Sequence, residues 1–148
     1  MTTTLFIGID VSSRANSACL MSDNGSIVNS FSFNNDLAGA EIFVNLMLHH
    51  LKQGAFKKLM IATEAASFYD FHLVDFLATN VQLAIYKPEI YRFNPRIVNS
   101  FKKGCYSDIQ KTDSIDAVAI ADRLRFGRLP LLIKLLYAHN FEKTVSKR

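Results

Sequence analysis

Two apolar runs that each end in an acidic residue constrain this chain more than any other feature. Residues 5–11 (LFIGIDV) carry Asp10 near their end, and residues 58–64 (KLMIATE) end in Glu64. Runs of this length and composition predict buried strands of a sheet. An unpaired buried carboxylate is costly, so neither acid belongs to an apolar core. Because ligand and catalytic groups of α/β folds gather at the carboxyl ends of strands, we expect Asp10 and Glu64 to be functional.

A second pair of acids opens the last predicted helix. Asp113 and Asp116 lie three residues apart before an apolar run, and the helix is predicted to end near Arg125. Residues three apart are neighbours on one helix face, where like charges repel but two carboxylates suit a hard divalent cation. The same acids could instead cap the helix and complement its dipole, and this stretch alone favours that interpretation. Acids at two strand ends shift the balance towards a two-metal site of four carboxylates: Asp10, Glu64, Asp113 and Asp116.

The order of the predicted elements indicates one mixed sheet. Three antiparallel strands come first, and Asp-Asn-Gly at residues 23–25 predicts a type I′ hairpin turn between the second and third. Units of strand and helix follow, which places helices on the faces of the sheet. The remaining segments are predicted as a helix at 37–53 ended by Gly54, a strand at 58–64, an aromatic helix at 68–79 with its rings in the core, a fifth strand at 81–86, and a helix opened by Pro95.

Size and composition exclude several classes of protein. With 148 residues, 49% of them hydrophobic and 20% charged, the chain is expected to form one ordinary globular domain. It has neither an apolar run of about 20 residues nor a recognisable secretory signal. Cys19 and Cys105 lie far apart without metal-site spacing, which predicts neither a disulfide nor a zinc site. These features together predict a cytoplasmic protein without a membrane partner.

The charges are divided unevenly along the chain. Residues 1–86 contain four basic and seven acidic residues, a net charge of −3, whereas residues 87–148 contain thirteen and six, a net charge of +7. A basic half beside an acidic site favours a polyanion as partner, with a solvated basic face as the alternative. The candidate contacts to a nucleic-acid backbone are Arg14, Arg92, Arg96, Lys102, Lys103 and Lys111.

Four motifs in this order resemble a known family. They are GIDVS at 8–12, ATEA at 62–65, NPR at 94–96 and KTDSIDA at 111–117. Together they are similar to the N-terminal domain of the DEDD transposases of insertion sequences, whose catalytic domain is RuvC-like. The resemblance implies a ribonuclease-H-like fold: a mixed five-stranded sheet, its first three strands antiparallel, with helices on both faces. It assigns residues 1–130 to the catalytic domain and leaves 131–148 as a divergent or truncated tail.

The resemblance also carries expectations about function. It implies cleavage and exchange of DNA strands during transposition, with Mg²⁺ (or Mn²⁺ as the alternative ion) held by Asp10, Glu64, Asp113 and Asp116. The expected partners are branched or element-end DNA, a structured guide RNA and further copies of the chain. Family members are longer and carry a second domain with a serine nucleophile, which this sequence does not match after residue 130.

Two other functions remain open at the level of sequence. A nucleic-acid-binding fragment that does not cut would keep the domain without its activity. A fragment of the sugar-kinase and Hsp70-like ATPases would also place an acid on its first strand. Those ATPases need a glycine-rich phosphate turn after it, and this chain has Ser12-Ser13-Arg14 there.

Overall fold

A single mixed sheet organises the structure, which is a computed structural model describing residues 3–65, 68–105 and 113–128. The five strands are β1 (Thr4–Val11), β2 (Ala15–Met21), β3 (Ile27–Asn34), β4 (Lys58–Glu64) and β5 (Glu89–Phe93). The helices are α1 (Leu37–Gln53), α2 (Phe71–Ala78), α3 (Pro95–Cys105) and α4 (Asp113–Phe126), with a short 3₁₀ helix at Ala84–Tyr86.

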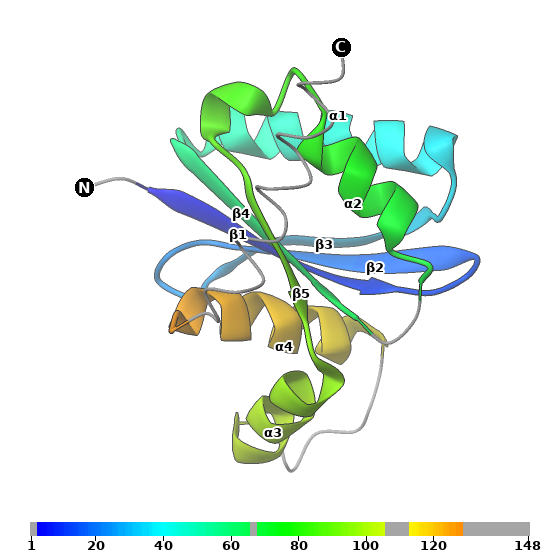
Figure 1. The fold of residues 1–148 in the computed structure, drawn as a ribbon. Helices are drawn as coiled ribbons and strands as arrows, with labels where there is room; N and C mark the ends of the chain where they lie inside the picture. Colours follow the sequence, from blue (N-terminus) through cyan, green and yellow to red (C-terminus); the bar gives the residue numbers. More distant parts are fainter. Residues whose placement is uncertain (1–2, 66–67, 106–112, 129–148) are drawn as a thin grey trace.

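The strand order confirms the predicted topology. The sheet runs β3-β2-β1-β4-β5, in which β1, β2 and β3 pair antiparallel while β4 is parallel to both β1 and β5. Figure 1 shows α1 and α2 on one face of the sheet and α3 and α4 on the other. Strand β1 lies at the centre of the sheet with β2 and β4 on either side, so the two apolar runs that end in acids are neighbouring interior strands.

The predicted fifth strand at 81–86 is wrong, and β5 lies a few residues later. Leu83 and Tyr86 are buried, whereas Val81 and Ile85 are 85% and 75% exposed. Burial at positions three apart fits the 3₁₀ helix that the structure has there and not the two-residue period of a strand. The sequence pattern is misleading here because Val81 and Ile85 are apolar and yet exposed.

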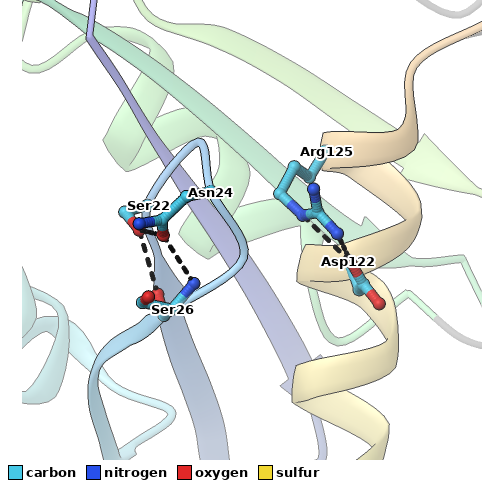
Figure 2. A network of polar contacts seen from close by, with 5 residues as sticks. All are labelled: Ser22, Asn24, Ser26, Asp122 and Arg125. Atoms are coloured by element: carbon cyan, nitrogen blue, oxygen red, sulfur yellow. Dashed lines mark hydrogen bonds and ion pairs between the residues drawn. The ribbon is translucent and has the colours of Figure 1, made fainter.

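The first hairpin forms where predicted, but its turn is not type I′. Gly25 alone among the turn residues has a positive φ, at +88°, and its N–H donates to the carbonyl of Ser22 at 3.0 Å. This is a three-residue loop in which a type I turn is followed by a left-handed glycine. Figure 2 shows the Asn24 side chain accepting from the Ser26 N–H at 2.9 Å, which closes the loop from inside.

Helix α1 begins at the predicted residue because Asp36 caps it. The Asp36 carboxylate accepts from the Gly39 N–H at 2.7 Å, and Gly54 follows the last helical residue. The buried face of the helix packs on the sheet, with Phe43 stacked on Phe33 at 4.3 Å between ring centroids. This face of the molecule is the larger apolar core, and it contains none of the predicted acids.

Helix α4 lies across the opposite face, directly against the central strand. A Cβ placed on Gly8 would lie 2.3 Å from both the Ala117 carbonyl oxygen and the Ala121 nitrogen, so only glycine permits this contact. At the other end of the helix, the Arg125 guanidinium lies beside the hairpin glycine and donates to Asp122 at 2.8 Å (Figure 2). These contacts fix α4 antiparallel to β1, with its first turn at the carboxyl end of that strand.

Two further sequence predictions concern single features of the chain. Cys19 is buried and Cys105 exposed, and both are free thiols, in agreement with the prediction of no disulfide. Within the described residues, none of the helices has the length and apolar character needed to cross a membrane. The predicted tail at 131–148 lies outside the described residues.

Candidate active site

Two of the predicted acids meet at one edge of the sheet. Strands β1 and β4 are parallel, and Ile9 lies opposite Thr63 in their register. The next residue on each strand is the acid, so Asp10 and Glu64 are neighbours at the carboxyl ends of the two central strands. Both are partly exposed. The edge therefore presents two carboxylates to solvent while the strands behind them stay buried.

The same two acids share the face that α4 covers. Side chains two residues apart on a strand point to one face. Gly8 lies beneath the backbone of Ala117, which puts Asp10 on that face. Ala62 packs in the cluster formed with the α3 and α4 side chains, which puts Glu64 there too. The sheet thus directs both carboxylates towards the start of α4.

Asp116 brings the third carboxylate from the first turn of α4. Its Oδ1 atom accepts from the Lys102 ammonium of α3 at 2.6 Å. Burial raises the pKa of the Glu64 carboxyl, the Lys102 ammonium lowers it, and the Asp116 carboxylate raises it again, leaving it above its ordinary value. These influences mean that Glu64, Asp116 and Lys102 act on one another across the edge of the sheet.

The fourth predicted acid and one predicted base cannot be assigned positions in the same way. Asp113 is the first residue of α4, three before Asp116, but its side chain lies outside the described residues. Lys111 also lies outside the described residues. Of the four predicted acids, the structure therefore places Asp10 beside Glu64, and Glu64 within electrostatic range of Asp116.

The donor set suits a hard divalent cation. All three side chains are carboxylates, and oxygen ligands are those that Mg²⁺ and Mn²⁺ prefer. The Lys102 ammonium, which is paired with Asp116, already places one positive charge at this edge. Among the described side chains, no group of three or more His, Cys, Asp and Glu is drawn close enough to hold a metal ion as it stands. The residues fit a hard divalent cation by their chemistry, and the Lys102 ammonium supplies one positive charge at Asp116.

Sequence reasoning missed a buried ion pair next to this edge. Asp70 is 1% exposed and accepts from the Arg92 guanidinium at 2.6 and 2.9 Å and from the Thr63 hydroxyl at 2.9 Å. Arg92 also stacks over the Phe71 ring, 4.3 Å from its centroid. Because Thr63 directly precedes Glu64, this cluster ties the end of β4 to β5 and to the start of α2. Nothing local in the sequence pairs residues 22 positions apart.

The predicted basic contacts divide into two groups. Arg92 and Lys102 are engaged with Asp70 and Asp116 inside the protein. The exposed candidates are Arg14 in the turn after β1, Arg96 in the first turn of α3, and Lys103 near its end. Since β1 and β5 are parallel to β4 and end at the same edge, Arg14 and Arg96 flank the edge that carries the acids.

The aromatic segment near residue 70 is more exposed than predicted. Phe68, Tyr69 and Phe71 are 78%, 52% and 43% exposed, whereas only Phe76 packs against the core. The prediction that these rings belong to the core is therefore wrong for Phe68 and for Phe71, the first residue of α2. Asp70, which lies between them, does not cap the helix, because its carboxylate points inward and pairs with Arg92.

The topology defines a fold class. A mixed five-stranded sheet in the order 3-2-1-4-5, with helices on both faces, is the arrangement of the ribonuclease-H-like fold. Among solved structures, RuvC of Thermus thermophilus matches with a TM-score of 0.54 and 13% identity, covering 86% of this chain and 98% of that one. The T. thermophilus RuvC in complex with a Holliday junction substrate matches with a TM-score of 0.52 and 10% identity, covering 83% and 92%. These likenesses confirm the predicted ribonuclease-H-like fold.

Comparison with models of protein families identifies the family to which the chain belongs. Residues 7–135 match the IS110-type DEDD transposases, described as transposases, so the chain belongs to that family. Comparison with curated proteins finds no match. The family predicted from the four motifs is confirmed, and the chain is a transposase domain with the fold of a nucleic-acid-cleaving enzyme.

Proposed function

We propose that this transposase domain cleaves and joins DNA strands in a metal-dependent reaction, with Asp10, Glu64, Asp113 and Asp116 as the metal ligands. The observation that supports it best is the convergence of the first, second and fourth of these acids at one edge of the sheet. A chain gains nothing in stability from carboxylates that repel one another there. Their proximity makes sense when a divalent cation binds between them.

The residues of the chain divide the work in this proposal. Asp10, on the most central strand, would hold the metal together with Glu64, Asp113 and Asp116. Bound divalent ions would activate the attacking oxygen and stabilise the leaving oxygen of the phosphodiester. The rigid sheet fixes the first two carboxylates, and the Gly8 contact fixes the distance of α4 from them. The protein thereby preorganises the ligands before any substrate arrives.

We propose DNA as the substrate because of the basic residues around the acids and because of the similarity of fold to RuvC. Arg14 and Arg96 flank the acidic edge, and Lys103 extends the basic surface along α3. Such residues bind phosphates without reading sequence. A RuvC with the same fold is described in complex with a Holliday junction, which favours branched DNA here. We also propose a structured guide RNA and further copies of the chain as partners. These two proposals are based only on the resemblance to the transposase family.

The proposal is tested by nicking of labelled branched and element-end DNA in Mg²⁺ or Mn²⁺. Asp10→Asn keeps the shape of the side chain and removes the charge, so cleavage is expected to fall by about 10²-fold or more while DNA binding persists. Glu64→Gln is expected to do the same. The wild-type reaction should stop when a chelator is added.

Three outcomes would count against the proposal. Equal nicking by wild type and Asp10→Asn would mean that the cleavage belongs to something else. DNA binding without nicking by the wild type in either ion would favour the non-cutting binding module. Thermal stabilisation by ATP would revive the ATPase alternative, which the family membership does not support.

A further inference from the structure

We propose that Lys102 is a built-in counter-cation of this acidic edge, which neutralises Asp116 while metal is absent and opposes the binding of a divalent cation there. The inference rests on the proposed metal-binding role of the acids. It concerns the regulation of that site: the chain's own ammonium competes with the metal, and metal affinity is set partly by Lys102.

The ion pair is held in place by two packed helices. Lys102 lies on α3 and Asp116 on α4, and the Nζ–Oδ1 distance is 2.6 Å. The two side chains are only 17% and 26% exposed. Beneath them, Val98 of α3 packs in one cluster with Ile120 and Leu124 of α4. This pair therefore differs from a surface salt bridge whose partners are free to separate into solvent.

A second acid from another element lies on the same side of the sheet. Glu64 ends β4, and Ala62 two residues before it packs in the cluster formed by α3 and α4 side chains. A divalent cation held by Asp116 and Glu64 would therefore lie close to the Lys102 ammonium.

Simultaneous occupancy is unfavourable for two reasons. The Asp116 lone pair that accepts from Lys102 is not available to a metal, which leaves the carboxylate fewer sites to offer. An ammonium and a divalent cation sharing one carboxylate would also repel each other in a partly desolvated setting. Metal binding is therefore opposed by Lys102, and removal of the ammonium should strengthen it.

The test is calorimetric titration of the chelator-treated full chain with Mn²⁺. We expect Lys102→Met to bind Mn²⁺ roughly three- to tenfold more tightly than Lys103→Met. Lys103 is the matched control, since it is the next residue of α3, is exposed, and loses the same charge. Lys102→Arg, which keeps the cation, should stay near the wild type. Equal affinities for the two methionine variants would overturn the inference.

Two additions keep the result interpretable. Lys102→Gln can still donate to Asp116 without a charge, so it provides a second neutral variant if Lys102→Met does not fold, as judged by circular dichroism. Glu64→Gln separates the two proposals. If that substitution leaves Mn²⁺ binding unchanged, or if neither the wild type nor the neutral variants bind Mn²⁺, the proposed metal site itself fails. If it abolishes binding but the two methionine variants agree, only the role of Lys102 fails.

Discussion

At the scale of single residues, Glu64 is the predicted site acid whose ionisation the fold disfavours. It stands at the end of a buried strand, and Asp116 faces it from α4 while Lys102 offsets only part of the effect. Its pKa is raised in the folded protein, first by burial and then by the Asp116 carboxylate. The ionised acid therefore opposes folding unless a cation joins it.

This raised pKa predicts how stability changes with pH in a chelating buffer. In the folded state Glu64 holds its proton to higher pH than in the unfolded chain, where the pKa is near 4.5. The Glu64 contribution to the free energy of unfolding is thus most favourable below that value and falls as pH rises through the raised pKa. Urea unfolding between pH 4 and 8 should show Glu64→Gln gaining stability relative to the wild type as pH increases, then levelling off.

A stability difference that does not change with pH would contradict this prediction. A difference that shrinks as pH rises would reverse its sign, and would mean that the Lys102 ammonium outweighs burial and Asp116. Adding Mn²⁺ should reduce the advantage of the variant, because the ion stabilises only a protein with the carboxylate.

At the scale of elements, the packing of α4 on β1 decides the geometry of the site. Gly8 of β1 allows the helix backbone to approach, and the atoms nearest its missing side chain belong to the main chain of Ala117 and Ala121. Main-chain atoms of a packed helix cannot rotate away as a side chain would. The separation of Asp10 from Asp116 therefore depends on a residue that carries no functional group.

We expect Gly8→Ala to destabilise the protein by about 2–3 kcal/mol, or more if the helix cannot shift. Gly104→Ala is the matched control, since nothing lies within 4 Å of its added Cβ. Gly104 is the next-to-last residue of α3, so the same substitution there should stabilise by at most about 0.5 kcal/mol. Chemical denaturation of both variants measures the pair, and destabilisation of equal size at the two positions would refute the packing argument.

Elements with a strong local signal were predictable from the sequence, and those shaped by distant partners were not. The capped helix α1 and the strands β1 and β4 carry their own signals of period and termination. Strand β5 carries no such signal, because its charged residues are stabilised by partners on other elements. Glu89 pairs with Lys58 at 3.1 Å, and Arg92 pairs with Asp70. Before those partners are known, a strand with such charges resembles a surface segment.

The candidate site shows the same division. Asp10 and Glu64 could be predicted because a carboxylate after a buried run is costly without a purpose. Their meeting with Asp116 required the parallel register of β1 and β4 and the direction of α4. The engagement of Lys102 by Asp116 could not be predicted, because sequence alone does not say which of several lysines reaches back into the site.

At the scale of the whole molecule, the positive charge of the described residues is concentrated on one helix. Helices α3 and α4 lie on one face of the sheet (Figure 1), and α3 carries Arg96, Lys102 and Lys103 without an acidic residue. Arg14 and Arg96 flank the acidic edge, while Lys57 precedes β4 at the opposite edge. A polyanion approaching the first edge would meet exposed positive charge beside the carboxylates of Asp10 and Glu64.

This arrangement predicts a local dependence of DNA affinity on single charges. Arg96→Gln should weaken binding for all DNA sequences alike and lower the slope of log affinity against log salt by about one. Lys57→Gln removes the same charge from the opposite edge and should leave the slope unchanged. Fluorescence anisotropy in a chelating buffer measures both variants without cleavage. Equal effects at the two positions would mean that binding follows net charge and not this edge.

The contact between Gly8 and α4 also limits how the domain can diverge. A larger residue at position 8 collides with main-chain atoms, so no substitution on the helix can make room for it by shrinking a side chain. Compensation would require moving the whole helix, and with it Asp116, away from the two strand-borne acids. Related domains that keep the geometry of the acids are therefore expected to keep the glycine. In a related domain without this glycine, we expect the arrangement of the acids to be lost as well.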